Sequence, residues 1–178
     1  MSQEYLALCA MAPDRPGLVR ELTEFIGERG VNIDDSRMAI LGGEFAMTLL
    51  LSGTKENIEK VERDVTAFEE RSQSRTLLRR TKSPEDHRRG ELRGFVVTAE
   101  SFDREGIVRA IASALHELGA NVVSLETTQW NAPFTGATLF RIELAAEVPR
   151  TIAIAAVKSK MEEVATAENL DIEVRTGT

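Results

Sequence analysis

Two short segments of the chain combine residue types that could bind a small charged molecule. They are Asp14-Arg15-Pro16-Gly17 and Asp103-Arg104-Glu105-Gly106. A glycine that precedes a helix removes the Cβ and lets a ligand approach the backbone, and the unpaired N–H groups of the helix N-terminus favour a carboxylate. An aspartate just before the glycine could hold an α-ammonium group. The two segments therefore fit the two charged ends of an amino acid.

An asparagine follows each glycine after the same interval. Asn32 lies 15 residues after Gly17, and Asn121 lies 15 residues after Gly106. The amide side chain offers both a donor and an acceptor to a ligand. These residues also have a purely structural interpretation, because aspartate commonly caps helices and asparagine tolerates the left-handed conformation in turns. Taken one at a time, the residues fit the structural interpretation at least as well.

Both segments belong to an internal repeat with an offset of 89 residues. The offset also relates Leu22 to Ile111, Ile26 to Leu115, and Val31-Asn32-Ile33 to Ala120-Asn121-Val122. A register that persists this far predicts two homologous halves. We expect a first domain over residues 1–81, a polar linker over 82–91 and a second domain over 92–178.

Each half shows the same succession of hydrophobic patterns. A short apolar run predicts a strand, an amphipathic period predicts a helix, two further runs predict a hairpin, and a second helix and a closing strand follow. Pro16 is expected just inside the first helix, where its missing N–H has no consequence. The fold class is therefore α+β, with each half forming a ferredoxin-like β-α-β-β-α-β unit on an antiparallel sheet.

The Asp14–Gly17 segment, the amphipathic helix and Gly30-Val31-Asn32-Ile33 together resemble the ACT domain, a regulatory module that binds amino acids and related metabolites. The resemblance covers nearly all of both halves. Two such domains in tandem look most like the glycine cleavage system transcriptional repressor family.

The resemblance implies that a ligand lies between two domains, with the first loop of one domain facing the asparagine of the other. One site would pair Asp14 and Gly17, in the loop that also holds Arg15 and Pro16, with Asn121; the other would pair Asp103 and Gly106 with Asn32. Glu105 stands where the first copy has Pro16, and we expect its negative charge in the first helical turn, where it would repel a carboxylate. The two sites are therefore predicted to be unequal, with the first one better.

The composition is that of an ordinary soluble globular chain, with 42% hydrophobic and 29% charged residues and a net charge of −7. The negative charge argues against sequence-independent binding of nucleic acid, and no DNA-reading motif fits between the predicted elements. The N-terminal residues lack the basic and apolar regions of a signal peptide, and no apolar run is long enough to cross a membrane. We expect a cytoplasmic protein with no direct contact to nucleic acid or membrane.

No catalytic or metal-binding set stands out, so we expect neither an enzyme nor a cofactor. Gly42-Gly43-Glu44-Phe45 is similar to the signature of diguanylate cyclases, but one acidic residue is missing and a glycine pair makes a hairpin turn readily. The single cysteine, Cys9, excludes an intrachain disulfide and is expected to be a buried, inert thiol between Leu8 and Ala10. Trp130 and Phe134, in the longer second hairpin, are expected to be partly exposed.

Basic residues gather between the two predicted domains: Arg71, Arg75, Arg79, Arg80, Lys82, Arg88, Arg89 and Arg93. They could dock an acidic partner or nucleic acid, or simply form a solvated edge. The predicted function is a non-enzymatic regulator that senses a small amino acid, glycine by analogy with the family, and acts through a protein partner in transcriptional control of glycine cleavage. An interaction module without ligand binding and an accessory subunit of an enzyme of amino-acid metabolism are the alternatives, and a homodimer stays open.

Overall fold

The computed structural model describes residues 3–86, 91–102, 105–132 and 136–176. The chain forms two compact units, Met1–Arg88 and Arg89–Thr178. The division falls inside the segment expected as a linker, while the limits of the two domains stay a prediction.

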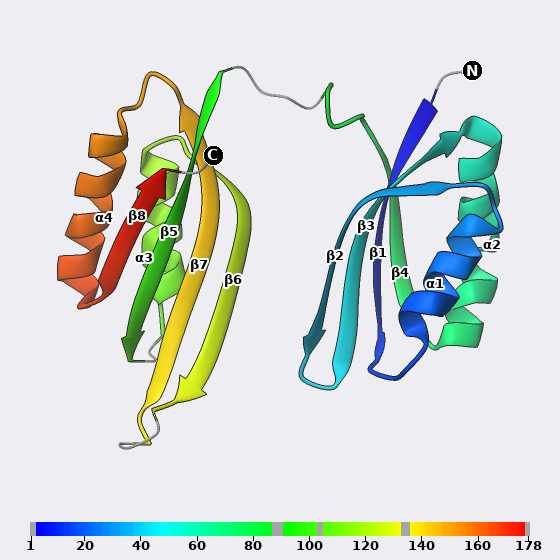
Figure 1. Cartoon of the computed structure of the whole chain (residues 1–178), viewed down its shortest axis with the longest axis horizontal. Coiled ribbons are helices and arrows are strands. Elements are labelled where there is room, and N and C mark those ends of the chain that lie inside the picture. Colours follow the sequence, from blue (N-terminus) through cyan, green and yellow to red (C-terminus); the bar gives the residue numbers. More distant parts are fainter. Residues whose placement is uncertain (1–2, 87–90, 103–104, 133–135, 177–178) are drawn as a thin grey trace. The chain divides into compact units, whose positions relative to one another are not determined.

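The first unit has the element order β-α-β-β-α-β (Figure 1). Its elements are β1 (Gln3–Pro13), α1 (Leu18–Gly27), β2 (Asn32–Leu41), β3 (Glu44–Thr54), α2 (Lys55–Ser72) and β4 (Arg75–Thr81). The strands form one antiparallel sheet in the order β2-β3-β1-β4. Both helices cover the same face of this sheet, and the other face is free of helices (Figure 1).

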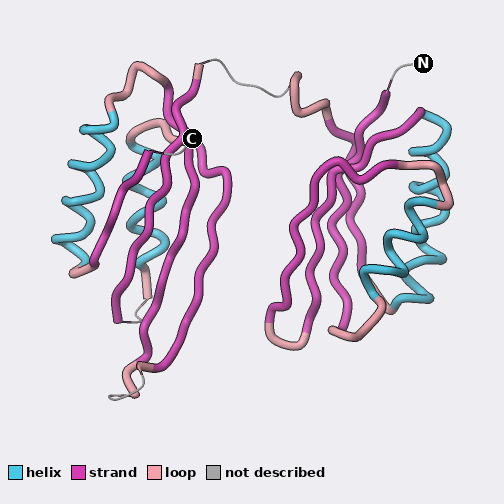
Figure 2. Tube along the Cα trace, in the orientation of Figure 1, coloured by secondary structure: helices cyan, strands magenta, loops and turns pink. Residues whose placement is uncertain are grey.

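The second unit repeats the first (Figure 2). Its elements are β5 (Leu92–Phe102), α3 (Ile107–Glu117), β6 (Asn121–Asn131), β7 (Thr138–Pro149), α4 (Ile154–Glu168) and β8 (Asp171–Thr176). The sheet order is β6-β7-β5-β8, and all pairs are antiparallel. Even an irregularity recurs, because the register shifts between Ile33 and Asp35 in β2 and between Val122 and Ser124 in β6. The predicted α+β fold with two ferredoxin-like units is confirmed.

Each unit has its own hydrophobic core between its sheet and its helices. In the first unit, Phe25 of α1 stacks on Phe68 of α2 with ring centroids 4.7 Å apart, and both side chains are buried. In the second unit, Ile111 and Leu115 of α3 pack with Met161 of α4 over the strands. The two cores share no residue.

The exposure of Cys9 corrects one expectation. Successive strand residues point to opposite faces, and Leu6, Leu8 and Ala10 of β1 face the helices and are buried. Cys9 therefore points to the face without helices, and its side chain is exposed. The prediction of a buried thiol is wrong because the residues beside a strand position in sequence are not its neighbours in space.

The Gly42-Gly43 segment is a hairpin turn, as predicted. Leu41 of β2 pairs with Glu44 of β3, and Gly42 has φ 67°, a conformation that glycine adopts without strain. In the longer second hairpin Trp130 is partly exposed, and Phe134 lies outside the described residues. No helix among the described residues is long and apolar enough to cross a membrane.

Candidate functional site

The loop between β1 and α1 ends in a glycine that caps the helix with its backbone alone. Gly17 is the N-cap of α1, with φ 95° and ψ −9°, and no side chain caps the helix. A left-handed conformation of this kind is disfavoured for residues with a Cβ. Asp14 is therefore not the cap, and the structural interpretation given for it above is wrong. Pro16 precedes the N-cap and lies outside the helix, not inside its first turn.

The uncapped start of α1 leaves backbone donors available. The first intrahelical bond joins the Glu21 N–H to the Gly17 carbonyl at 2.9 Å. The N–H groups of Leu18, Val19 and Arg20 consequently have no acceptor among the described residues. These are the donors at the positive end of the helix dipole, which is the chemistry that binds a carboxylate.

Two interactions hold the loop against the rest of the unit. The Asp14 N–H donates to the Gly43 carbonyl in the β2–β3 turn at 2.9 Å. The Arg15 guanidinium donates two hydrogen bonds to the two carboxylate oxygens of Glu21, each at 2.7 Å. This bidentate bond lowers the pKa of the Glu21 carboxyl group, and the carboxylate in turn raises the pKa of Arg15. Arg15 therefore stabilises the loop, and its guanidinium is bound to Glu21.

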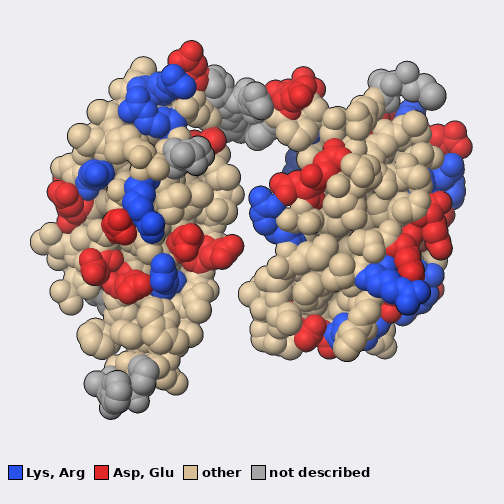
Figure 3. Space-filling view, in the orientation of Figure 1, with Lys and Arg blue, Asp and Glu red and all other residues tan. Residues whose placement is uncertain are grey.

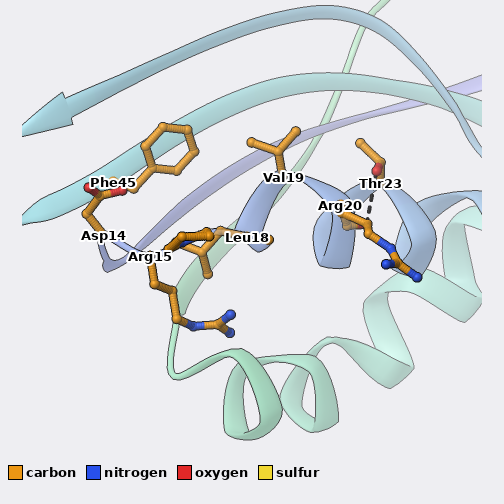
Figure 4. Close-up of a pocket in the computed structure, with 9 residues that line it drawn as sticks. Asp14, Arg15, Leu18, Val19, Arg20, Thr23 and Phe45 are labelled. Atoms are coloured by element: carbon orange, nitrogen blue, oxygen red, sulfur yellow. Dashed lines mark hydrogen bonds between the residues drawn. The ribbon is translucent and has the colours of Figure 1, made fainter.

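A hollow of about 580 Å³ opens beside this loop. Its lining combines the loop with the first turns of α1 and one strand residue: Asp14, Arg15, Pro16, Gly17, Leu18, Val19, Arg20, Thr23 and Phe45. In Figure 4, Asp14 lies beside the Phe45 ring and Arg15 extends to the other side of the loop, toward α2. The Asp14 carboxylate is exposed and has no hydrogen bond among the described residues, so it is available to a ligand.

The second unit repeats the N-cap geometry of this site. Gly106 is the N-cap of α3, with φ 95° and ψ −8°, and a hollow of about 410 Å³ is lined by Gly106, Ile107, Val108, Arg109, Ala112 and Phe140. Asp103 lies outside the described residues. Glu105 precedes the N-cap, so the expectation that its charge stands in the first helical turn is wrong: α3 begins at Ile107 and has no acidic residue in its first turn.

Side chains beside the two glycines differ in charge. A Cβ added at Gly17 would lie 3.8 Å from a carboxylate oxygen of Glu21, whereas one added at Gly106 would lie 3.9 Å from the Arg109 guanidinium. The 89-residue offset relates Glu21 to Ala110, so an alanine stands where the first copy has the acidic partner of Arg15. The two N-cap glycines share a backbone conformation, and the side chains near them differ in charge.

Two pairs of lining residues are missing from the sequence-based set. The offset relates Arg20 to Arg109, and Phe45 and Phe140 occupy the start of β3 and β7 next to the two loops. The arginine pair could have been found, because it keeps the repeat register within the first helical turn. The phenylalanines could not have been found from the sequence, because their contact with the loop depends on where the hairpin lies relative to it.

Asn32 and Asn121 each begin a strand at the far end of their own sheet. Asn32 pairs with Ser52, which lies opposite Tyr5 of β1, whereas Asp14 follows Pro13 at the other end of β1. The stretch Tyr5–Pro13 spans roughly 26 Å, so Asn32 does not join the loop of its own unit. The Asn32 amide instead donates to the Asp34 carboxylate at 2.6 Å. The pairing of each asparagine with the loop of the other unit stays a prediction.

The basic residues near the end of the first unit differ in their contacts. Arg80 binds Glu4 at 2.6 Å and Glu62 at 2.7 Å on the helix-covered side of the sheet, which raises its pKa. Arg88 and Arg89 lie outside the described residues. Acidic and basic side chains are interspersed on the face of the molecule that Figure 3 shows. Among the described residues, no group of three or more His, Cys, Asp or Glu side chains could hold a metal ion.

A family model matches most of the first unit. Residues 4–75 match the model of the ACT domain. The glycine cleavage system transcriptional repressors of Escherichia coli (strain K12) and Shigella flexneri are each 46% identical to this chain over 61 residues. That match covers 34% of this chain and 32% of each relative, so it spans about a third of the length of these curated proteins.

Two solved structures match the whole chain. A protein of unknown function from Galdieria sulphuraria is 29% identical with a TM-score of 0.84, over 99% of this chain and 100% of that one. A candidate glycine cleavage system transcriptional repressor is 25% identical with a TM-score of 0.74, over 100% of this chain and 99% of that one. The likeness thus extends over both units.

Proposed function

We propose that this chain, whose residues 4–75 match the model of the ACT domain, is a regulatory protein and not an enzyme. It senses a small amino acid at the loops that precede α1 and α3 and passes the signal to a protein partner. By analogy with its repressor relatives, the pathway it regulates is glycine cleavage, at the level of transcription, and glycine is the first ligand to test.

One observation supports this proposal above the others. Each unit has a left-handed glycine as N-cap, no side-chain cap, and a hollow directly beside the free end of the helix. Glycine is itself a common N-cap, but unlike Ser, Thr, Asp or Asn it leaves the first N–H groups without a side-chain acceptor. A helix start left open in both copies suits a carboxylate ligand.

Under this proposal, the residues of the first loop have different roles. The ligand carboxylate accepts hydrogen bonds from the N–H groups at the start of α1, and the exposed Asp14 carboxylate holds the ammonium group. Arg15 fixes the loop through Glu21. Asn121 completes this site and Asn32 the second one, as in the family arrangement.

The two sites are proposed to be unequal, with the first one tighter. Its hollow is larger, and its loop is fixed by the Arg15–Glu21 pair, whereas the second loop has Ala110 in place of Glu21. A loop already held in its bound conformation has less freedom to lose on binding.

Isothermal titration calorimetry with the twenty amino acids tests the proposal. We expect one tight and one weak site for a small amino acid, and loss of the tight site in Asp14→Ala, because an unpaired ammonium group loses at least about tenfold in affinity. Asp103→Ala should affect only the weak site. Glu85→Ala removes an exposed carboxylate away from the loop and should leave binding unchanged. No heat with any amino acid, or two equal sites, would contradict the proposal.

Capture of interaction partners tests the regulatory output. A ligand that switches a two-state protein changes the affinity for its partner by roughly 5- to 150-fold. We expect binding of a component of transcription control to change by that order when the amino acid is added, and not to change in Asp14→Ala. Capture of a metabolic enzyme instead would identify an accessory subunit.

A further inference from the structure

The sheet face without helices in the first unit exposes apolar side chains and two arginines without an ion pair, besides the acidic side chains of Asp35 and Glu44. It carries Arg75, Leu77 and Arg79 of β4, Cys9 and Met11 of β1, Thr48 of β3, and Asp35 and Arg37 of β2. Leu77 is 68% exposed and Met11 48% exposed, which leaves a large apolar area in contact with solvent. We refer to these eight residues as the N face.

The equivalent face of the second unit is acidic. It carries Asp171, Glu173 and Arg175 of β8, Thr98, Glu100 and Phe102 of β5, Arg141, Glu143 and Glu147 of β7, and Glu126 and Trp130 of β6. Phe102 is 66% exposed. We refer to these eleven residues as the C face.

Two of the three arginines on the N face have no ion pair among the described residues, although the pKa of Glu69 is lowered by hydrogen bonds from Thr76 and, to a lesser extent, by the nearby Arg75. Arg37 pairs with Asp35 on the same strand. Arg75 and Arg79 lie on the edge strand β4, on the same side of it, and neither has an ion pair among the described residues. Two unpaired arginines therefore flank the exposed Leu77.

On the C face, acidic side chains outnumber basic ones. Glu126 of β6 and Glu143 of β7 are directly opposite each other, an arrangement of like charges that destabilises an antiparallel pair. Arg141 pairs with Glu100 and Arg175 with Glu173. Glu126 and Glu143 have no ion pair within the described parts of the chain, so this exposed carboxylate pair is free to bind a cationic group.

We propose that the N face of one copy of this chain docks on the C face of a second copy. The unpaired arginines of the N face neutralise the Glu126–Glu143 pair of the C face, and the exposed apolar side chains of both faces leave water. The contact is a face-to-face packing of two sheets, which places them about 10 Å apart.

Each copy offers one N face and one C face, so a two-fold dimer in which both pairs of faces meet contains two identical contacts. Four strands about 4.8 Å apart and six paired residues of about 3.3 Å each give a face of roughly 20 by 20 Å. Four such faces cover about 1,600 Å², which is the size of a typical specific interface.

Charge reversal on the full-length chain tests this contact. Arg75→Glu/Arg79→Glu makes the N face acidic, and Glu126→Arg/Glu143→Arg makes the C face basic. Lys55→Glu/Arg63→Glu is the matched control, because it makes the same change of charge as the first variant on exposed positions of α2. Sedimentation velocity over about a hundredfold range of concentration gives the dimer dissociation constant, and circular dichroism checks that each variant is folded.

We expect the wild-type chain and the control to dimerise, with a dissociation constant that rises with salt concentration. Each face variant alone should dimerise at least about tenfold more weakly, because like-charged faces then meet. An equimolar mixture of the two variants should form a heterodimer of wild-type strength, because both of its contacts again join opposite charges.

Three results would overturn the proposal. They are a wild-type chain that stays monomeric at low salt, a dimer that both face variants retain, and a mixture of variants that does not restore the dimer. If the wild type is monomeric, the N face does not bind a second copy, whatever the variants do. The mixing experiment is decisive because it restores a contact between copies and cannot restore one within a copy.

Discussion

Two requirements apply to Gly17: its backbone conformation favours glycine, and the proposed ligand binds beside it. Its φ of 95° is accessible to glycine and disfavoured for other residues, while a Cβ added there would lie 3.8 Å from the nearest side-chain atom, which is ordinary contact. The space around Gly17 would therefore admit a Cβ, and it is the backbone conformation that disfavours other residues at this position. We predict that Gly17→Ala destabilises the first unit by about 1 kcal/mol, as measured by urea denaturation.

Gly27, near the end of the same helix, is the matched control. A Cβ there would meet nothing within 4 Å, and its φ is not in the left-handed region. Gly27→Ala should therefore stabilise the unit by about 0.5–1 kcal/mol, since alanine has the higher helix propensity. Equal effects of the two substitutions would refute a role for the Gly17 conformation.

The Arg15–Glu21 pair makes the stability of the first unit depend on pH. The hydrogen bond from Arg15 lowers the pKa of Glu21 from its ordinary value of 4.5. The pair therefore stabilises the folded state fully above pH 4.5, and this contribution is lost as the pH falls through the lowered pKa. We predict that the difference in urea midpoint between wild type and Arg15→Gln is largest near neutral pH and shrinks below pH 4.5.

An exposed ion pair provides the comparison. Arg20 binds Glu24 one turn away on α1, and both side chains are largely exposed. Because solvent screens such pairs, Arg20→Gln should change the midpoint less than Arg15→Gln at neutral pH. A difference between wild type and Arg15→Gln that stays constant from neutral to acidic pH would show that the pair does not contribute through ionisation.

At the level of helices and strands, the second helices of the two units differ in how they begin. The Thr54 hydroxyl caps α2 by accepting a hydrogen bond from the Asn57 N–H at 3.3 Å. At the start of α4 the N-cap is Ala153, with an extended backbone and no side-chain bond. We predict that Thr54→Ala costs about 1 kcal/mol and that Ala153→Thr gains about 0.5–1 kcal/mol, as measured by thermal denaturation. A loss in Ala153→Thr would contradict the capping argument.

The order of the elements can be predicted because the chain contains its pattern twice. Leu22 and Ile26 on one helix and Ile111 and Leu115 on another recur at the same offset, and all four are buried. Helix starts are harder to predict, since Pro16 suggests a helix that includes it. The observed start is set by the left-handed conformation of Gly17, which no periodicity reveals.

The candidate site can be predicted only in part, because its residues come from elements whose approach is a tertiary property. The Asp14–Gly17 loop is continuous in sequence and is recognisable there. Phe45 reaches the hollow because the β2–β3 turn accepts a hydrogen bond from Asp14 through the Gly43 carbonyl. A hydrophobic residue that begins a strand carries no sign of such a contact.

Over the whole molecule, the presence of two cores without a shared residue predicts separate stabilities. Phe68 is 2% exposed and stacks on Phe25, so Phe68→Ala removes about 3–5 kcal/mol from the first unit. Amides of β1 and β3 should then exchange with deuterium roughly a hundredfold faster or more, while those of β5 and β7 keep their wild-type rates. Hydrogen exchange followed by mass spectrometry measures both sets of amides, at high salt to weaken contacts between charged faces.

Met161→Ala, in the second core, should produce the opposite pattern, because Met161 is 1% exposed and belongs to the core of the second unit. Equal acceleration in both units by either variant would show that the two units unfold as one cooperative structure.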